Sequence, residues 1–198
     1  MEARPSVVIL AGPNGAGKST AAPFLLGQAL LNVRLFINAD EIAAERSPGN
    51  PASVAITAGR EMLSRLHELG QQQLSFAFET TLASRHFAPW LTGLVASGYS
   101  MDILFLWLPT PDLAVARVKT RVMLGGHDVP EAVVHRRYWR GLRNFFELYQ
   151  PLATNWRVYD SAVSRDPSLI AAGGGPTVVD VIDLVTWERI RRGAHGGE

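Results

Sequence analysis

The sequence contains no cysteine among its 198 residues, and its only lysines are Lys18 and Lys119. Without cysteine the chain can form no disulfide bond and no thiolate metal site, and it cannot use a thiol nucleophile. The absence is typical of proteins that work in a reducing compartment, so we expect a cytoplasmic protein.

The chain also lacks a strong charge of either sign and a long apolar run. Its formal net charge is +1, so bulk electrostatics favour neither nucleic acid nor a membrane surface as a partner. No apolar run is long enough to cross a bilayer, and residues 1–5 do not have the pattern of a signal peptide. The length suits one domain with its own core, and we expect a single domain over residues 1–198.

The clearest motif matches the phosphate-binding loop pattern G-x-x-x-x-G-K-[ST]. Glycines let the backbone adopt positive φ, so that successive N–H groups point at an anion. In this pattern Lys18 reaches the β- and γ-phosphates, and the Ser19 hydroxyl is a ligand for Mg²⁺. An apolar run over residues 6–11 supplies the strand that must precede the loop. The motif predicts a nucleotide-phosphate site made by Gly12, Pro13, Asn14, Gly15, Ala16, Gly17, Lys18, Ser19 and Thr20.

Apolar strand patterns alternate with helical patterns along most of the chain. Strands are expected at residues 6–11, 33–38, 74–79, 99–108 and 156–160. Helices are expected at residues 18–28, 51–69 and 130–149, around residues 87–95, and from residue 110. This alternation predicts an α/β fold: a P-loop kinase-like parallel sheet with helices on both faces and a short arginine-bearing lid.

The expected core of this domain spans about residues 6–161. A hairpin and a terminal helix are expected at about residues 168–192, and the tail at residues 193–198 is expected to be disordered. In such a sheet ligands bind beyond the carboxyl ends of the strands. The residues that follow each strand are therefore the candidates for chemistry.

Acidic residues follow three of the predicted strands. Asp40 is placed to orient or deprotonate an acceptor hydroxyl, and Glu79 is placed to hold Mg²⁺ together with Ser19. Thr80 follows Glu79 directly and belongs to the same candidate site. Asp40 is also consistent with a loop or capping acid, and Asp160 is equally consistent with an acid that only caps a turn.

The segments after the fourth predicted strand are rich in arginine, whose guanidinium group suits phosphate oxygens. We expect a lid that clamps the transferred phosphoryl group with Arg117, Arg121 and one of Arg136 and Arg137. A Gly-Gly pair at residues 125–126 is expected to act as its hinge. The next two arginines along the helix are expected to form an ordinary solvated basic face: Arg140 and Arg143.

Several of these motifs in order resemble the zeta toxin family. They are the P-loop, NADE at residues 38–41, FETT at 78–81, GGHDVPE at 125–131 and RRY at 136–138. The P-loop alone also resembles that of ABC-transporter ATPases. The chain has no LSGGQ signature, however, and none of its predicted strands ends in the Asp-Glu pair of those ATPases. The resemblance to zeta toxins covers about residues 6–161.

The resemblance implies a kinase of a toxin–antitoxin system, with an antitoxin protein as a partner. Such a kinase transfers the γ-phosphate of ATP or GTP, with Mg²⁺, to a hydroxyl of UDP-N-acetylglucosamine or a related nucleotide sugar. The resemblance also implies roles for individual residues. Lys18 and Ser19 hold the phosphates and Mg²⁺, Asp40 is the catalytic base, Glu79 binds substrate or metal, and Arg121 and Arg136 steady the transferred phosphate, with Thr80, Arg117 and Arg137 as further substrate or lid residues.

Other functions stay open from the residues themselves. The same scaffold serves kinases of other metabolites and of polynucleotide 5′-hydroxyls. It also serves nucleotide-binding ATPase or switch modules that act through a partner.

Overall fold

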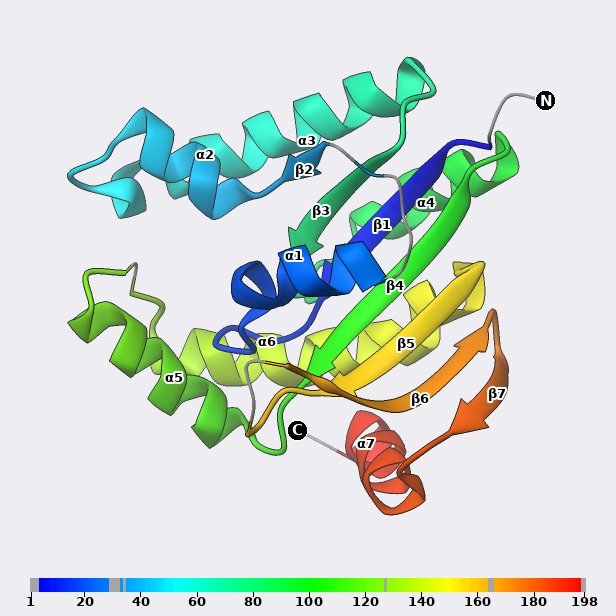
Figure 1. The fold of residues 1–198 in the computed structure, drawn as a ribbon. Helices are drawn as coiled ribbons and strands as arrows, with labels where there is room; N and C mark the ends of the chain where they lie inside the picture. The colour runs from blue at the N-terminus through cyan, green and yellow to red at the C-terminus, as the bar shows by residue number, and fades with distance from the viewer. Residues whose placement is uncertain (1–3, 29–32, 34, 127, 164–165, 197–198) are drawn as a thin grey trace.

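The fold is built around one seven-stranded sheet (Figure 1). The structure is a computed structural model that describes residues 4–28, 33, 35–126, 128–163 and 166–196. The strand order is β2-β3-β1-β4-β5-β6-β7; the first five strands are parallel, and β6 and β7 add an antiparallel hairpin at one edge. The predicted α/β fold with a largely parallel sheet is therefore confirmed.

The central strands are buried because helices pack on both faces of the sheet. Ile9 of β1 lies between Phe78 of β3 and Ile103 of β4, and all three side chains are fully buried. Burial on both faces is the reason for the nearly continuous apolar runs. The strands are β1 (Ser6–Ala11), β2 (Phe36–Ile37), β3 (Phe76–Thr80), β4 (Ser100–Trp107), β5 (Asn155–Asp160), β6 (Ser168–Gly174) and β7 (Thr177–Val181).

The helices divide between the two faces. One face carries α1 (Lys18–Gln28) and α5 (Pro111–Met123), and the other carries α3 (Ala55–Gln71), α4 (Phe87–Ala96) and α7 (Leu184–Gly196). Helix α6 (Glu131–Asn144) and the π-helical turn that continues it contribute to both apolar clusters. Among the described residues no helix combines the length and the apolar character needed to span a bilayer.

The region after β1 and α1 departs from the sequence-based prediction. Of the strand expected over residues 33–38, the structure has β2, and residue 34 lies outside the described residues. A helix that was not predicted, α2 (Ala39–Arg46), follows β2. The side chain of Asn38 accepts a hydrogen bond from the backbone N–H of Asp40 at 2.8 Å and so caps this helix. Asp40 therefore lies in the first turn of a helix. The helix expected over residues 51–69 is a 3₁₀ turn (Pro51–Val54) followed by α3.

The expectation of a disordered tail is wrong for residues 193–196, because α7 continues to Gly196. Tertiary packing stabilises this part of the helix: Ala194 is buried, and Gly193 lies against the ring of Trp139. Residues 197 and 198 of that tail lie outside the described residues, as does His127 in the motif at residues 125–131.

Helix α6 packs closely on the loop that follows β3. A Cβ built on Gly141 would overlap the carbonyl oxygen of Thr81, and Asn144 Nδ2 donates a hydrogen bond to the Leu82 carbonyl oxygen at 2.8 Å. The overlapping atom belongs to the backbone, so it can yield only if the helix or the loop moves. The close approach of α6 to this loop therefore depends on a residue without a side chain.

Replacing Gly141 with alanine is expected to lower the free energy of unfolding by about 1–3 kcal/mol, the usual cost of overpacking. Gly93 in α4 is a matched control, because a Cβ there meets none of the described atoms within 4 Å. Gly93→Ala should raise stability by about 0.5–1 kcal/mol through helix propensity. Urea unfolding of both variants measures the difference, and equal stabilities would show that the close packing at Gly141 is relaxed in solution.

Candidate active site

The P-loop connects β1 to α1, as its sequence predicts. Gly12, Gly15 and Gly17 have φ values of 139°, 77° and 78°. A Cβ at Gly12 would overlap the Leu106 carbonyl oxygen, and one at Gly15 would lie 2.7 Å from the Ala114 carbonyl oxygen. Glycine is therefore favoured at all three positions by the backbone conformation, and at Gly12 and Gly15 it is also required by the close approach of β4 and α5.

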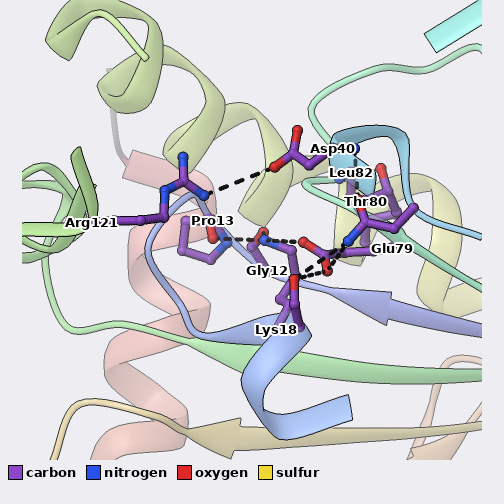
Figure 2. A network of polar contacts seen from close by, with 10 residues as sticks. Gly12, Pro13, Lys18, Asp40, Glu79, Thr80, Leu82 and Arg121 are labelled. Atoms are coloured by element: carbon purple, nitrogen blue, oxygen red, sulfur yellow. Dashed lines mark hydrogen bonds and ion pairs between the residues drawn. The ribbon is translucent and has the colours of Figure 1, made fainter. Parts of the chain in front are cut away.

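Lys18 is buried at the mouth of this loop. Its Nζ donates hydrogen bonds to the carbonyl oxygens of Gly12 and Pro13, both at 3.0 Å, and lies 3.5 Å from Glu79 Oε1 (Figure 2). Burial lowers the pKa of Lys18, while the negative charges of Glu79 and Asp40 oppose that shift. The ammonium group is thus held where a nucleotide phosphate would replace the carbonyl oxygens as its partner.

Glu79 is the next-to-last residue of β3, and its side chain contacts both the P-loop and Asn38, which follows β2. Its Oε2 accepts hydrogen bonds from Ser19 Oγ at 2.7 Å and from Asn38 Nδ2 at 3.1 Å. A serine hydroxyl and a carboxylate are oxygen ligands of the kind that Mg²⁺ prefers, together with waters and nucleotide phosphates. The described residues contain no group of three or more acidic or histidine side chains that could hold a metal ion by themselves. Ser19 and Glu79 are therefore the residues of this site that could hold Mg²⁺ together with a nucleotide.

Asp40 and Arg121 face one another across the mouth of the site. Asp40 projects from the first turn of α2 and Arg121 from α5, and Arg121 Nη1 lies 3.9 Å from Asp40 Oδ2 (Figure 2). The Asp40 side chain is 65% exposed, so its carboxylate is open to an incoming molecule. Helix α5 thus brings one of the predicted lid arginines, Arg121, close to Asp40, the acid that was predicted to follow the second strand.

Two cavities share the residues around this pair. A cavity of about 410 Å³ surrounds the P-loop and also contacts Arg117 and Arg121. A larger cavity of about 950 Å³ extends from it between α3, the loop after β3 and α6. Because both cavities border the same acids, a group bound in one can meet a group bound in the other. The residues that line both are Asn14, Ala39, Asp40, Glu79, Thr80, Thr81 and Arg137.

The expected lid arginines lie in different environments. Arg117 Nη2 donates to the Ala162 carbonyl oxygen at 2.6 Å and Nη1 to that of Gly15 at 3.4 Å, so this side chain is bonded to two loops. Arg137 lines both cavities, and burial together with the charge of Arg136 lowers its pKa. Arg136 lines the larger cavity.

Three features of the site were not predicted from the sequence. Asn38 was assigned to the end of a strand, although an asparagine two residues before an acid is a signal for a helix N-cap. Arg85, after β3, lines the larger cavity, and no local pattern marked it. Arg140 and Arg143 are exposed, as expected of a basic face, but both also line that cavity.

Asp160 accepts a hydrogen bond from the Ala162 N–H at 2.7 Å, which matches the alternative of a turn cap.

Tyr138 connects α6 to the end of β4. Its hydroxyl donates to the carbonyl oxygen of Leu108, the residue just after β4, at 2.6 Å. Burial raises the pKa of Tyr138 to about 12. In the unfolded chain a tyrosine ionises near pH 10. The contribution of the neutral hydroxyl to stability is therefore complete below about pH 10 and is lost as the pH rises toward about 12.

Tyr138→Phe is expected to lower the free energy of unfolding at pH 7 by about 1 kcal/mol, because the Leu108 carbonyl oxygen loses its donor. The deficit should shrink between pH 10 and 12, where wild type loses the contribution of the hydroxyl and the variant does not. Urea unfolding at pH 7 and pH 11 measures this. A deficit that stayed constant would show that ionisation of Tyr138 is not linked to folding.

The sequence of this domain matches a family model over most of its length. The model describes the zeta toxin and covers residues 1–162. The chain belongs to the zeta toxin family. The hairpin β6–β7 and helix α7 of this zeta toxin family member lie outside the matched region.

Relatives and solved structures agree with that membership. An uncharacterized protein of Haemophilus influenzae is 30% identical over 131 residues, which cover 66% of this zeta toxin family chain and 91% of the relative. The structure of AvrRxo1-ORF1:-ORF2 with ATP is similar with a TM-score of 0.74 at 16% identity, over 96% of this chain and 64% of that one. The chain therefore spans less than two thirds of that protein. At this identity the similarity shows the fold alone.

A toxin–antitoxin structure shares the fold as well. The PezAT chromosomal system of Streptococcus pneumoniae has a TM-score of 0.65 at 14% identity, over 98% of this chain and 80% of that one. This similarity shows that the fold extends over nearly the whole zeta toxin family chain. The family assignment that the sequence motifs predicted is confirmed by the family match over residues 1–162.

Proposed function

We propose that this protein is a kinase that transfers the γ-phosphoryl group of ATP or GTP to a hydroxyl of a small molecule. One observation carries the proposal: Asp40 lies on the boundary between the P-loop cavity and a second, larger cavity, and faces Arg121 there. A nucleotide in the first cavity and an acceptor in the second would meet at this carboxylate. Membership in the zeta toxin family and the P-loop fold support a phosphotransferase.

In this mechanism the acceptor oxygen attacks the γ-phosphorus, a new P–O bond forms, and the bond to the β–γ bridging oxygen breaks. Asp40 orients the acceptor hydroxyl and takes its proton. Lys18 and the lid arginines Arg121 and Arg136 or Arg137 stabilise the charge on the transferred group and on the departing diphosphate. Ser19 and Glu79 would hold Mg²⁺, which supplies further neutralisation of phosphate charge. Thr80 lines both cavities and would contact the substrate. Arg117 would hold the lid side of the site in place through its hydrogen bonds to two loops.

Membership in the zeta toxin family leads us to propose UDP-N-acetylglucosamine or a related nucleotide sugar as the acceptor. The larger cavity, at about 950 Å³, has room for a molecule of that size. We also propose an antitoxin protein as a partner that covers the site; a toxin–antitoxin system is among the solved structures that share this fold, which supports such a partner. Action in a reducing cytoplasm is consistent with the lack of cysteine.

A label-transfer assay tests the proposal. The protein is incubated with Mg²⁺, γ-labelled ATP or GTP, and separate acceptors: nucleotide sugars, free sugars, nucleosides and oligonucleotides. The expected result is label on a small-molecule hydroxyl, lost when EDTA removes Mg²⁺. Label on an oligonucleotide would identify a polynucleotide kinase. Label released only as inorganic phosphate would contradict the kinase and favour an ATPase or switch module.

A further inference from the structure

Helix α7 contacts the short segment that joins β4 to α5. Arg189 Nη2 donates a hydrogen bond to the carbonyl oxygen of Pro109 at 3.1 Å. The same guanidinium group lies over the ring of Trp107, with its carbon 5.7 Å from the ring centroid, a position at which the ring attracts a cation. No acidic residue forms an ion pair with Arg189 in the part of the chain that the structure describes. This arginine is therefore directed at the end of β4.

The hydrogen bond from α7 is one of three that bind successive carbonyl groups of this segment. The Trp107 carbonyl oxygen accepts from the hydroxyl of buried Ser161, just after β5, at 3.0 Å. The Leu108 carbonyl oxygen accepts from the Tyr138 hydroxyl of α6 at 2.6 Å. With Pro109, three consecutive carbonyl groups are each bound by a different element, and α7 supplies the third bond.

The segment leads directly into α5 and is stiff. Thr110 caps α5 by accepting a hydrogen bond from the Leu113 N–H at 3.1 Å. Pro109 and Pro111 each have a φ angle fixed by the ring, and a proline also restricts the residue before it to an extended conformation. Thr110 has such a conformation, with φ −146° and ψ 153°. Because few torsion angles are free between the Pro109 carbonyl group and the first turn of α5, a shift of this carbonyl group moves the start of the helix.

Helix α5 carries two of the arginines proposed for the lid. Arg121 lies about 15 Å along the helix from Pro111. At that length a tilt of about 4° at the start of α5 displaces Arg121 by about 1 Å. Arg117, nearer the start of the helix, is bonded to two loops. The position of Arg121 relative to Asp40 therefore depends on how firmly the start of α5 is held.

Helix α7 is packed well enough to act as a support. The ring of Trp187 stacks on that of Trp156 in β5, with centroids 5.5 Å apart and 14° between the ring planes. Trp187 and Ile190 are both buried in the apolar cluster on this face of the sheet. The side chain of Arg189 is exposed and takes no part in this packing. Removing its guanidinium group should therefore leave α7 in place.

We infer that Arg189 is a positioning residue that holds the start of α5, and through it the lid arginines, relative to the P-loop and Asp40. Arg189 lines neither cavity of the site, so it acts through α5. The family match ends at residue 162, so this support comes from a part of the chain outside the match. The expected effect on the rate rests on the proposed function, whereas the position of α5 does not depend on catalysis.

Spin labels on two introduced cysteines measure the position of α5. The chain has no cysteine of its own, so the labels attach only where they are placed. Met123→Cys labels the exposed end of α5, and Thr92→Cys labels the exposed side of α4. Electron–electron double resonance gives the distribution of distances between them. Arg189→Gln in this background is expected to broaden or shift the distribution. Arg189→Lys, which can still donate to the Pro109 carbonyl oxygen, should keep that of wild type.

Phosphotransfer kinetics without the labels measure the consequence for the site. Arg189→Gln should lower kcat about 3- to 10-fold, the range expected from one lost hydrogen bond, while KM for ATP changes little because the lid arginines act on the transferred group. Arg189→Lys should restore most of the rate. Arg192→Gln is the matched control, because Arg192 is an exposed arginine of the same helix whose Nε donates to the Glu188 carbonyl oxygen. The control should keep the rate and the distance distribution of wild type.

The inference is overturned if the distance distribution of Arg189→Gln matches that of wild type. A lower melting temperature with an unchanged distribution would assign Arg189 a stabilising role alone. A broadened distribution with an unchanged kcat would contradict the link from α5 to the lid arginines. A broadened distribution in a protein that, as wild type, transfers label to no acceptor would support the hold on α5 and contradict the kinase. Label transfer by wild type with an unchanged distribution in Arg189→Gln would do the reverse.

Discussion

Replacing Asp40 with asparagine is expected to slow phosphotransfer by about 10²- to 10⁴-fold, the usual contribution of a positioned general base. The amide keeps the shape of the side chain but cannot take a proton from the acceptor. Asp40 forms no hydrogen bond to a P-loop residue in the part of the chain that the structure describes, and its ion-pair partner is Arg121 at 3.9 Å. Binding of an ATP analogue should therefore change little.

Single-turnover label transfer, with a separate titration of the analogue, separates these two effects. Glu45→Gln is the matched control, because Glu45 is an exposed acid five residues later on α2 and lines neither cavity. The control should retain the rate of wild type. If Asp40→Asn transferred phosphate at the rate of wild type, Asp40 would not be the base, and it would be left with a role in positioning Arg121.

Replacing Lys18 with methionine should lower the transfer rate by about 10²- to 10³-fold, the cost of losing one preorganised charge at the reacting group. Methionine fills much of the buried volume of the lysine stem but supplies neither the charge nor the donors now shared by Gly12, Pro13 and Glu79. Mg²⁺ and ATP should raise the melting temperature of wild type and should raise that of the variant much less.

The chain offers an unusually direct control for this variant, because its only other lysine is Lys119. Lys119 lies on the surface of α5, 66% exposed, with an ion pair to Glu131 at 3.0 Å. Surface pairs of this kind contribute little. Lys119→Met should keep both the activity and the thermal shift with ATP, and an equal loss in the two variants would show a general effect of removing a lysine.

Local sequence patterns predicted the parts of this protein that depend on neighbours in the chain. The P-loop follows from its glycines and from the strand before it, because positive φ at Gly12, Gly15 and Gly17 is a local requirement. The parallel sheet follows from apolar runs of strand length. The order of the motifs was enough to predict the zeta toxin family, which the family match over residues 1–162 confirms.

The ends of helices and strands were predicted less well where the local sequence is compatible with more than one structure. The residues around Asn38 end β2 and begin α2, where the Asn38 side chain caps the helix by accepting a hydrogen bond from the Asp40 N–H. The helical end of α7 depends on the contact between Gly193 and Trp139, which are 54 positions apart. The cap at Asn38 is a local signal that the apolar run before it obscured. The end of α7 could not be predicted from propensity, because tertiary packing overrides weak local preferences.

The sequence by itself therefore determined the phosphate loop, the α/β fold and the family. Only the tertiary structure brought Asp40 to Arg121 and turned Arg117 toward the Ala162 carbonyl oxygen. The tertiary structure also placed Arg85 in the same cavity as Arg140 and Arg143 of α6. The physical reason is the range of the interactions: glycine conformation and apolar periodicity act within a few residues, whereas a binding site is made by segments that meet only after the sheet has formed.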